Sequence, residues 1–163
     1  MYKRQLLLGC KKEDNTSSEM QYDGLTTTVE YKQLSGVEEN LLSLDIYYTS
    51  ETNVKKPVVI YVHGGAWSIG DKASQLDNKI ALFESLNYVL VSINYRLSPF
   101  PYELTNPDRV MFPVHNNDVA DAIKWVYDNI DTYGGNSNKI ALLGHSAGAV
   151  SYTHLTLPTT SRV

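Results

Sequence analysis

Two glycine-rich motifs, each at the end of an apolar run, contain the residues of this 163-residue chain that could perform nucleophilic chemistry. The later motif lies in residues 139–148, KIALLGHSAG, which contain the pattern G-x-S-x-G around Ser146. After an apolar strand this pattern predicts a nucleophile elbow, a sharp turn into a helix that leaves the serine hydroxyl exposed. Gly144 and Gly148 are expected because such a turn leaves no room for larger side chains. Ser146 is therefore the candidate nucleophile.

The earlier motif is HGGAW, residues 63–67, which directly follows the apolar run PVVIYV at 57–62. Glycines at the exit of a strand let backbone N–H groups point into open space. Such groups suit a site that must stabilise a negatively charged oxygen. Together the two motifs favour a hydrolase scaffold.

The order HGGAW, then VSINYRLSP, then GHSAG about 80 residues after the first motif resembles the α/β-hydrolase carboxylesterases. The resemblance is to the branch of hormone-sensitive-lipase-like esterases, arylformamidases and bacterial feruloyl or acetyl esterases. It covers roughly residues 25–149 and implies an α/β protein with an incomplete α/β-hydrolase fold. It also implies that Ser146 attacks a carboxylic ester and forms an acyl-enzyme.

The resemblance further assigns an oxyanion hole to the backbone N–H groups of Gly65, Ala66 and Ala147. The Ala147 donor belongs to the elbow, whereas Gly65 and Ala66 correspond to the family's HGGG loop, with Ala66 in place of its third glycine. Trp67 either lines the substrate pocket or packs in the interior. The implied substrates are small-molecule or polysaccharide esters, among them acetyl and feruloyl esters of plant polysaccharides. No cofactor is implied, and no spacing of His, Cys and carboxylates indicates a metal site.

The histidines and aspartates near the motifs have structural interpretations. His63 is expected to fix the glycine loop by hydrogen bonds, and the side chain of His145 should point away from the nucleophile. His115, which precedes a predicted helix, is expected to be a capping or surface residue. Asp71 and Asp118 are expected to anchor loops or helix starts.

The catalytic base and acid are missing from the pattern. In this fold the triad runs Ser, then Asp or Glu, then His along the chain. Beyond Ser146 there is no acidic residue, and the only histidine is His154. Without a base the hydroxyl is weakly nucleophilic, and losing the base of a related triad lowers kcat by about 10⁶. We expect the parent protein to be an esterase and this polypeptide to be inactive and unstable. An amidase or peptidase of the same fold and a non-catalytic binding module are the alternatives.

A succession of strands and helices must position the motifs. Alternating apolar residues predict an opening antiparallel pair, continuous apolar runs predict buried strands, and apolar stripes predict helices. The predicted strands are 27–31, 42–48, 57–62, 88–93 and 140–143, and the predicted helices are 76–83 and 117–130. This order predicts a parallel sheet with helices on both faces, in which the HGGAW loop and Ser146 meet at one edge.

Both ends of the chain are expected to be foreign. Residues 1–5 and 150–163 resemble a translated sequencing adapter, and such segments are left out of fold reasoning. The tail is rich in β-branched residues and contains Pro158, a composition opposed to a helix. Residues 25–149 are then the N-terminal part of an α/β-hydrolase domain within a longer gene product.

Residues 6–24 are interpreted as the end of a truncated lipoprotein signal followed by a tether. The run Leu7-Leu8-Gly9-Cys10 resembles a bacterial lipobox, and the polar residues after it are typical of a disordered segment. Lipidation at Cys10 would place the protein in the bacterial cell envelope, with this anchor as its contact with the membrane. A free surface thiol is the alternative.

Composition narrows the remaining classes. The net charge is −4 and there is no basic patch, which argues against nucleic acid as a partner. No stretch approaches the roughly 18 apolar residues that a membrane-spanning helix needs. The 42% of hydrophobic and 20% of charged residues fit a globular domain.

Overall fold

The computed structural model describes residues 24–50, 53–98 and 109–155. The strands are β1 (Leu25–Glu30), β2 (Ser43–Tyr48), β3 (Lys56–Val62), β4 (Val89–Ile93) and β5 (Gly135–Gly144). The helices are α1 (Asp77–Ser85), α2 (Val114–Asn129) and α3 (Ala147–Thr153), with short 3₁₀ helices at Glu39–Leu42 and Ile130–Tyr133. The predictions for residues 1–23, including Cys10, and for 156–163 lie outside the described residues.

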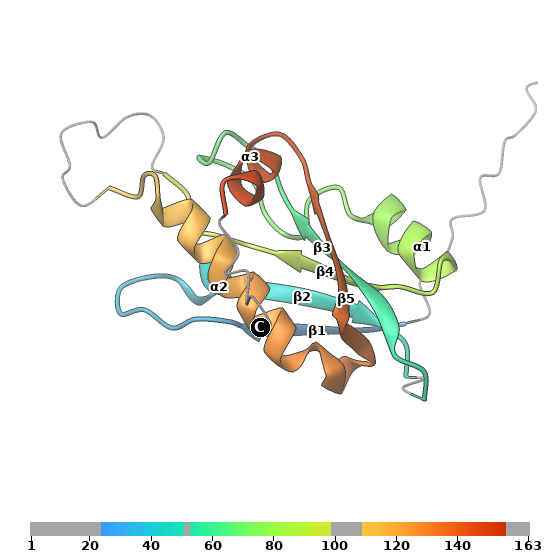
Figure 1. Cartoon of the computed structure of the whole chain (residues 1–163). Coiled ribbons are helices and arrows are strands. Elements are labelled where there is room, and N and C mark those ends of the chain that lie inside the picture. The colour runs from blue at the N-terminus through green and yellow to red at the C-terminus, as the bar shows by residue number, and fades with distance from the viewer. Residues whose placement is uncertain (1–23, 51–52, 99–108, 156–163) are drawn as a thin grey trace, which may run out of the picture.

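The strands form one sheet in the order β1-β2-β4-β3-β5, shown in Figure 1. β1 and β2 pair antiparallel, as the alternating pattern predicted, and β2 also pairs antiparallel with β4. β4, β3 and β5 are mutually parallel. The predicted parallel sheet is therefore confirmed, with β3 between β4 and β5.

Apolar side chains on both faces of the sheet explain the uninterrupted apolar sequence of β3. Val58, Ile60 and Val62 belong to a large cluster that includes Val119 and Val126 of α2. The alternate residues of β3 pack instead in a smaller cluster with residues of α1. Because side chains alternate along a strand, helices cover both faces of this sheet, as predicted. Figure 1 shows α2 and α1 as separate layers.

Helix α2 begins at Val114 rather than at 117, directly after Pro113. Proline is tolerated at a helix start because the first N–H groups have no intrahelical partner. His115 therefore lies in the first turn of α2, where it is 5% exposed. The prediction of a capping or surface histidine was wrong, because the extra turn brings this residue against the core.

Helix α3 continues to Thr153, so residues 150–153 are helical despite the expected break at 150. Val150 N donates to Ser146 O at 3.2 Å and His154 N donates to Val150 O at 3.3 Å. The side chain of Ser151 is fully buried. Tertiary packing outweighs the weak helix preference of this segment, and the predicted foreign origin of residues 150–163 stays a prediction. None of the helices in the described part of the chain has the length and apolar character that crossing a bilayer requires.

Candidate active site

Ser146 stands at the turn between β5 and α3, where its residue is exposed. Its φ and ψ are 51° and −119°, a rare combination for a residue with a side chain. A Cβ added to Gly144 would lie 2.6 Å from Ala149 N, and one added to Gly148 would lie 2.3 Å from Val62 O. The G-x-S-x-G segment thus has the predicted elbow geometry, and both glycines are needed for close backbone approach.

The register of β3 and β5 brings the two sequence motifs together. Val62 pairs with Gly144, so the parallel strands end side by side. His145 N donates a hydrogen bond of 3.1 Å to Val62 O across this edge. A Cβ added to Gly64 would lie 3.1 Å from the Cβ of Ser146. The HGGAW loop therefore contacts the elbow, as the topology predicted.

The HGGAW loop has an unusual backbone that exposes two donors. Gly65, Ala66 and Trp67 all have positive φ, at 116°, 52° and 60°. A Cβ on Gly65 would lie 1.9 Å from Ile69 O, which excludes any larger residue. Among the described residues, the N–H groups of Gly65, Ala66 and Ala147 donate to no protein acceptor. Three backbone donors are thus available near Ser146, and donors of this kind can hold an oxyanion.

His63 supports the HGGAW loop from inside. Its Nδ1 lies 2.7 Å from Gly64 O, and its ring stacks on Tyr95 at a centroid distance of 4.5 Å. The Tyr95 hydroxyl donates to His63 O at 2.9 Å. Burial lowers the pKa of His63, so the ring is neutral near pH 7. The geometry agrees with the predicted loop-fixing role.

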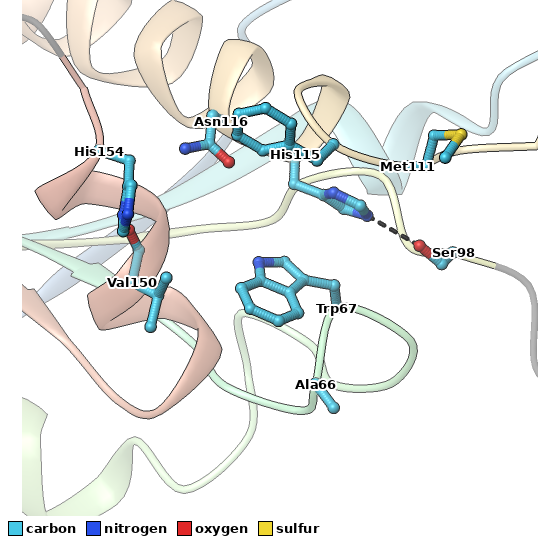
Figure 2. A pocket seen from close by; sticks show the side chains of 9 residues that line it. Ala66, Trp67, Ser98, Met111, His115, Asn116, Val150 and His154 are labelled. Carbon is cyan, nitrogen blue, oxygen red and sulfur yellow. Dashed lines mark hydrogen bonds between the residues drawn. The ribbon is translucent and has the colours of Figure 1, made fainter.

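A cavity of about 320 Å³ opens beside the HGGAW loop, as Figure 2 shows. Its lining residues are Ala66, Trp67, Ser98, Met111, Phe112, His115, Asn116, Val150 and His154. Trp67 both lines this cavity and packs against α3, where its Nε1 donates to Ser151 Oγ at 2.9 Å. Ser146 is not in the lining, but Val150, one helical turn later, and Ala66 are. The cavity therefore adjoins the candidate site without containing the nucleophile.

A hydrogen-bonded pair in this cavity wall was missed by sequence reasoning. Ser98 Oγ donates to Val110 O at 2.8 Å, and it lies 3.0 Å from His115 Nε2. Because the serine proton is used, His115 donates from Nε2 to the serine oxygen. Burial also lowers the pKa of His115. No sequence signal marked the pair, because Ser98 precedes a proline-rich stretch of sequence and its partner lies beyond that stretch.

The two aspartates that were predicted to be anchors hold loops. Asp118 is fully buried and accepts two hydrogen bonds of 2.7 Å from the guanidinium of Arg96, which fixes the segment after β4 to α2. Asp71 accepts from Ala73 N at 2.8 Å and from Asn94 Nδ2 at 3.0 Å. Hydrogen bonds from Asn94 and neighbouring groups keep the pKa of Asp71 low, against the opposing effect of its partial burial. Neither carboxylate is bonded to Ser146.

No base accompanies the nucleophile within the described residues, where Ser146 Oγ has no hydrogen-bond partner. His154 Nδ1 lies 2.8 Å from Val150 O, the carbonyl of its own helix, rather than at the elbow. The ring of His145 lies beside Gly64, since a Cβ on that glycine would be 2.7 Å from His145 Nδ1. No group of three or more His, Cys, Asp or Glu in the described ranges could hold a metal ion.

Known proteins resemble this chain in sequence and in structure. The profile of the Carboxylesterase family matches residues 9–163. Venom carboxylesterase-6 of Apis mellifera is 38% identical over 131 residues, covering 78% of this chain and 22% of that protein. Esterase LipQ of Mycobacterium tuberculosis is 39% identical over 114 residues, covering 70% of this chain and 25% of that protein. A hyperthermophilic esterase of the archaeon Pyrobaculum calidifontis has a similar structure, with a TM-score of 0.56, 32% identity, and coverage of 67% of this chain and 32% of its own.

These matches confirm the α/β-hydrolase type of fold. The chain spans about a quarter of the length of the curated relatives it matches, or less. The narrower branch of hormone-sensitive-lipase-like and feruloyl esterases is not confirmed by them.

Proposed function

The chain belongs to the carboxylesterase family, and from this premise we propose that it carries the nucleophile and oxyanion donors of a serine hydrolase that cleaves carboxylic esters. The observation that supports this best is the parallel register of β3 and β5, which sets the HGGAW loop against the elbow. A binding module would have no need for an exposed serine in a strained backbone conformation beside unpaired N–H groups.

In the proposed reaction Ser146 Oγ attacks the ester carbonyl carbon while a general base removes the hydroxyl proton. The developing oxyanion accepts hydrogen bonds from the N–H groups of Gly65, Ala66 and Ala147, each of the kind whose loss lowers kcat by about 10²–10³. The base returns its proton to the leaving oxygen as the intermediate expels the alcohol, and water then hydrolyses the acyl-enzyme to the acid and free Ser146. Because no described group can act as the base, we propose that the 163-residue polypeptide alone does not turn over.

We propose esters of small molecules or polysaccharides as substrates, with acetyl and feruloyl groups as candidates. The cavity beside Ala66 supports a bound organic group next to the reacting carbonyl, since its size falls in the range of small-molecule sites. The lipobox-like sequence before Cys10 supports, separately, a lipid anchor in the bacterial envelope. Incorporation of labelled palmitate that disappears in Cys10→Ser would support the anchor, and its absence from the unchanged protein would refute it.

The catalytic proposal is tested with the product of the intact gene, assayed with p-nitrophenyl acetate. Ser146→Ala should lower kcat by about 10⁶, as when a triad nucleophile is removed. Ser85→Ala, an exposed serine on α1, is the matched control and should keep full activity. Activity that survives Ser146→Ala would show that another group is the nucleophile. A folded but inert full-length protein would favour the binding module, and faster cleavage of an acyl p-nitroanilide would favour the amidase.

A further inference from the structure

We infer that Trp67 is a positioning residue, which holds the two halves of the oxyanion hole together through its indole hydrogen bond to Ser151. The inference rests on the proposed function for its catalytic meaning, whereas the contact itself belongs to the fold. One half of the hole is the HGGAW loop, with Gly65 and Ala66. The other half is Ala147, the first residue of α3.

The side chain and the backbone of Trp67 are held at opposite ends. The indole Nε1 donates to Ser151 Oγ at 2.9 Å, and Trp67 O accepts a hydrogen bond of 2.7 Å from Ser98 N. Figure 2 shows the indole lying between the HGGAW loop and α3. The residue therefore bridges two segments that are far apart in the sequence.

Ser151 carries the connection on to the elbow. Its hydroxyl donates to Ala147 O at 3.0 Å, so its oxygen is available to accept the indole N–H. Its own carbonyl accepts a hydrogen bond of 3.1 Å from Asn116 Nδ2 of α2. The serine is fully buried, so neither hydrogen bond competes with water. Through Ser151, the Trp67 indole is thus connected to Ala147, whose N–H is the third donor of the oxyanion hole.

The backbone of the HGGAW loop explains why such a tie is needed. Ala66 and Trp67 both have left-handed backbone angles, although both carry a Cβ. This conformation is unfavourable for residues other than glycine and persists when its surroundings enforce it. Without the tie, the loop would relax and the N–H groups of Gly65 and Ala66 would move relative to Ala147. A misplacement of about 1 Å in such a site costs about 10²-fold in rate.

The contact is tested on the 163-residue chain by NMR. The chain has two tryptophans, so the indole N–H of Trp125 serves as an internal reference. Ser151→Ala should shift the Trp67 indole signal and speed its hydrogen exchange by about fivefold, since a hydrogen bond of this kind contributes about 1 kcal/mol. Two hydrogen-bonded amides on either side of the site should exchange faster as well: Ile69 N, which donates to Gly65 O, and Val150 N, which donates to Ser146 O. Ser151→Thr keeps the hydroxyl and should leave all these signals near their original values.

The role in positioning is tested by the reaction of Ser146 with a fluorophosphonate, whose phosphoryl oxygen occupies the oxyanion hole in the adduct. Labelling over hours is followed by intact mass, with Ser146→Ala as the blank. Trp67→Phe and Ser151→Ala should lower the maximal labelling rate by about tenfold or more, with the half-saturating reagent concentration within about twofold, as expected for misplaced donors. Ser151→Thr should restore the rate. A Trp67 that only lines the cavity would instead raise the half-saturating concentration in Trp67→Phe and leave Ser151→Ala unaffected.

The two proposals fail in different ways. The proposed nucleophile is refuted if the product of the intact gene keeps its activity in Ser146→Ala, a result that does not depend on the NMR comparison. An unlabelled Ser146 in the 163-residue chain follows from the missing base, and the NMR comparison then decides the positioning role. If Ser151→Ala and Trp67→Phe leave the amide exchange of Ile69 and Val150 unchanged, the positioning role is refuted whatever the labelling shows.

Discussion

Gly148→Ala tests whether the elbow depends on backbone contact with β3. The added Cβ would lie 2.3 Å from Val62 O and 2.5 Å from His63 O. These atoms belong to a strand and its exit, so they cannot rotate away as a side chain would. Val62 O is also the acceptor for His145 N, at 3.1 Å. The substitution therefore acts on the contact that holds the nucleophile beside the HGGAW loop.

The expected loss follows from three effects. An ordinary contact begins near 3.4 Å, so α3 must move away from β3 in Gly148→Ala. Overpacking of this kind costs about 1–3 kcal/mol. Losing the hydrogen bond from His145 N costs about 1 kcal/mol, and the better helix propensity of alanine offsets about 1 kcal/mol. The free energy of unfolding should fall by about 1–3 kcal/mol, a large part of the stability of a marginal domain.

Urea denaturation and amide hydrogen exchange measure the two consequences of Gly148→Ala. The control is Gly36→Ala, where an added Cβ meets no atom within 4 Å. There, only the backbone strain of a residue with a φ of +79° lowers the free energy of unfolding. The control should lose about 1–2 kcal/mol and keep the His145 amide protected. Gly148→Ala should also speed exchange at His145. A Gly148→Ala variant with wild-type stability and a protected His145 amide would refute the steric explanation of the second motif glycine.

Two further predictions concern charge. Asp118→Ala leaves the Arg96 guanidinium without its buried partner and should lower the free energy of unfolding by about 3–5 kcal/mol. Asp128→Ala, which removes an exposed ion pair with Lys124, is the control and should lower it by less than about 0.5 kcal/mol. Equal losses for the two variants in urea denaturation would contradict the anchoring role of Asp118. Burial holds the pKa of His115 in the folded state below its ordinary 6.5, so as the pH falls the unfolded chain takes up the proton first. The stabilising effect of the neutral His115 is therefore complete above pH 6.5 and declines as the pH falls towards the lowered pKa. His115→Gln should reduce the loss of stability between pH 7 and pH 5, and an unchanged loss would show that His115 does not cause it.

The sheet and the elbow could be predicted from the sequence because their signals are local. An apolar run of strand length at 57–62 and another at 140–143 identify buried strands, and the handedness of crossovers then sets their exits side by side. The glycines at 144 and 148 mark positions where an added side chain would meet neighbouring backbone atoms. The pairing of Val62 with Gly144 follows from these facts together.

The side-chain contacts around the cavity could not be predicted, because the partners lie far apart in the sequence. Ser98 and His115 are 17 residues apart, and Trp67 and Ser151 are 84 residues apart. No periodic pattern relates such positions. The start of α2 was predicted too late because Pro113 is compatible with a helix start as well as with a loop. For this reason His115 was predicted to be a capping or surface residue, whereas it is buried.

The segment after the elbow differs from its prediction in a way that constrains the authentic sequence. Composition predicted a foreign, non-helical tail from residue 150, yet Ser151 is enclosed on every side and bonded to Trp67 and Ala147. An indole N–H that loses its acceptor costs about as much as a lost hydrogen bond. If residues 150–163 do replace an authentic sequence, the authentic residue at 151 must therefore be small and must accept a hydrogen bond. Serine or threonine meets both conditions, whereas a leucine or valine there in the intact gene would leave the indole unpaired and would separate the fold of this chain from that of its parent.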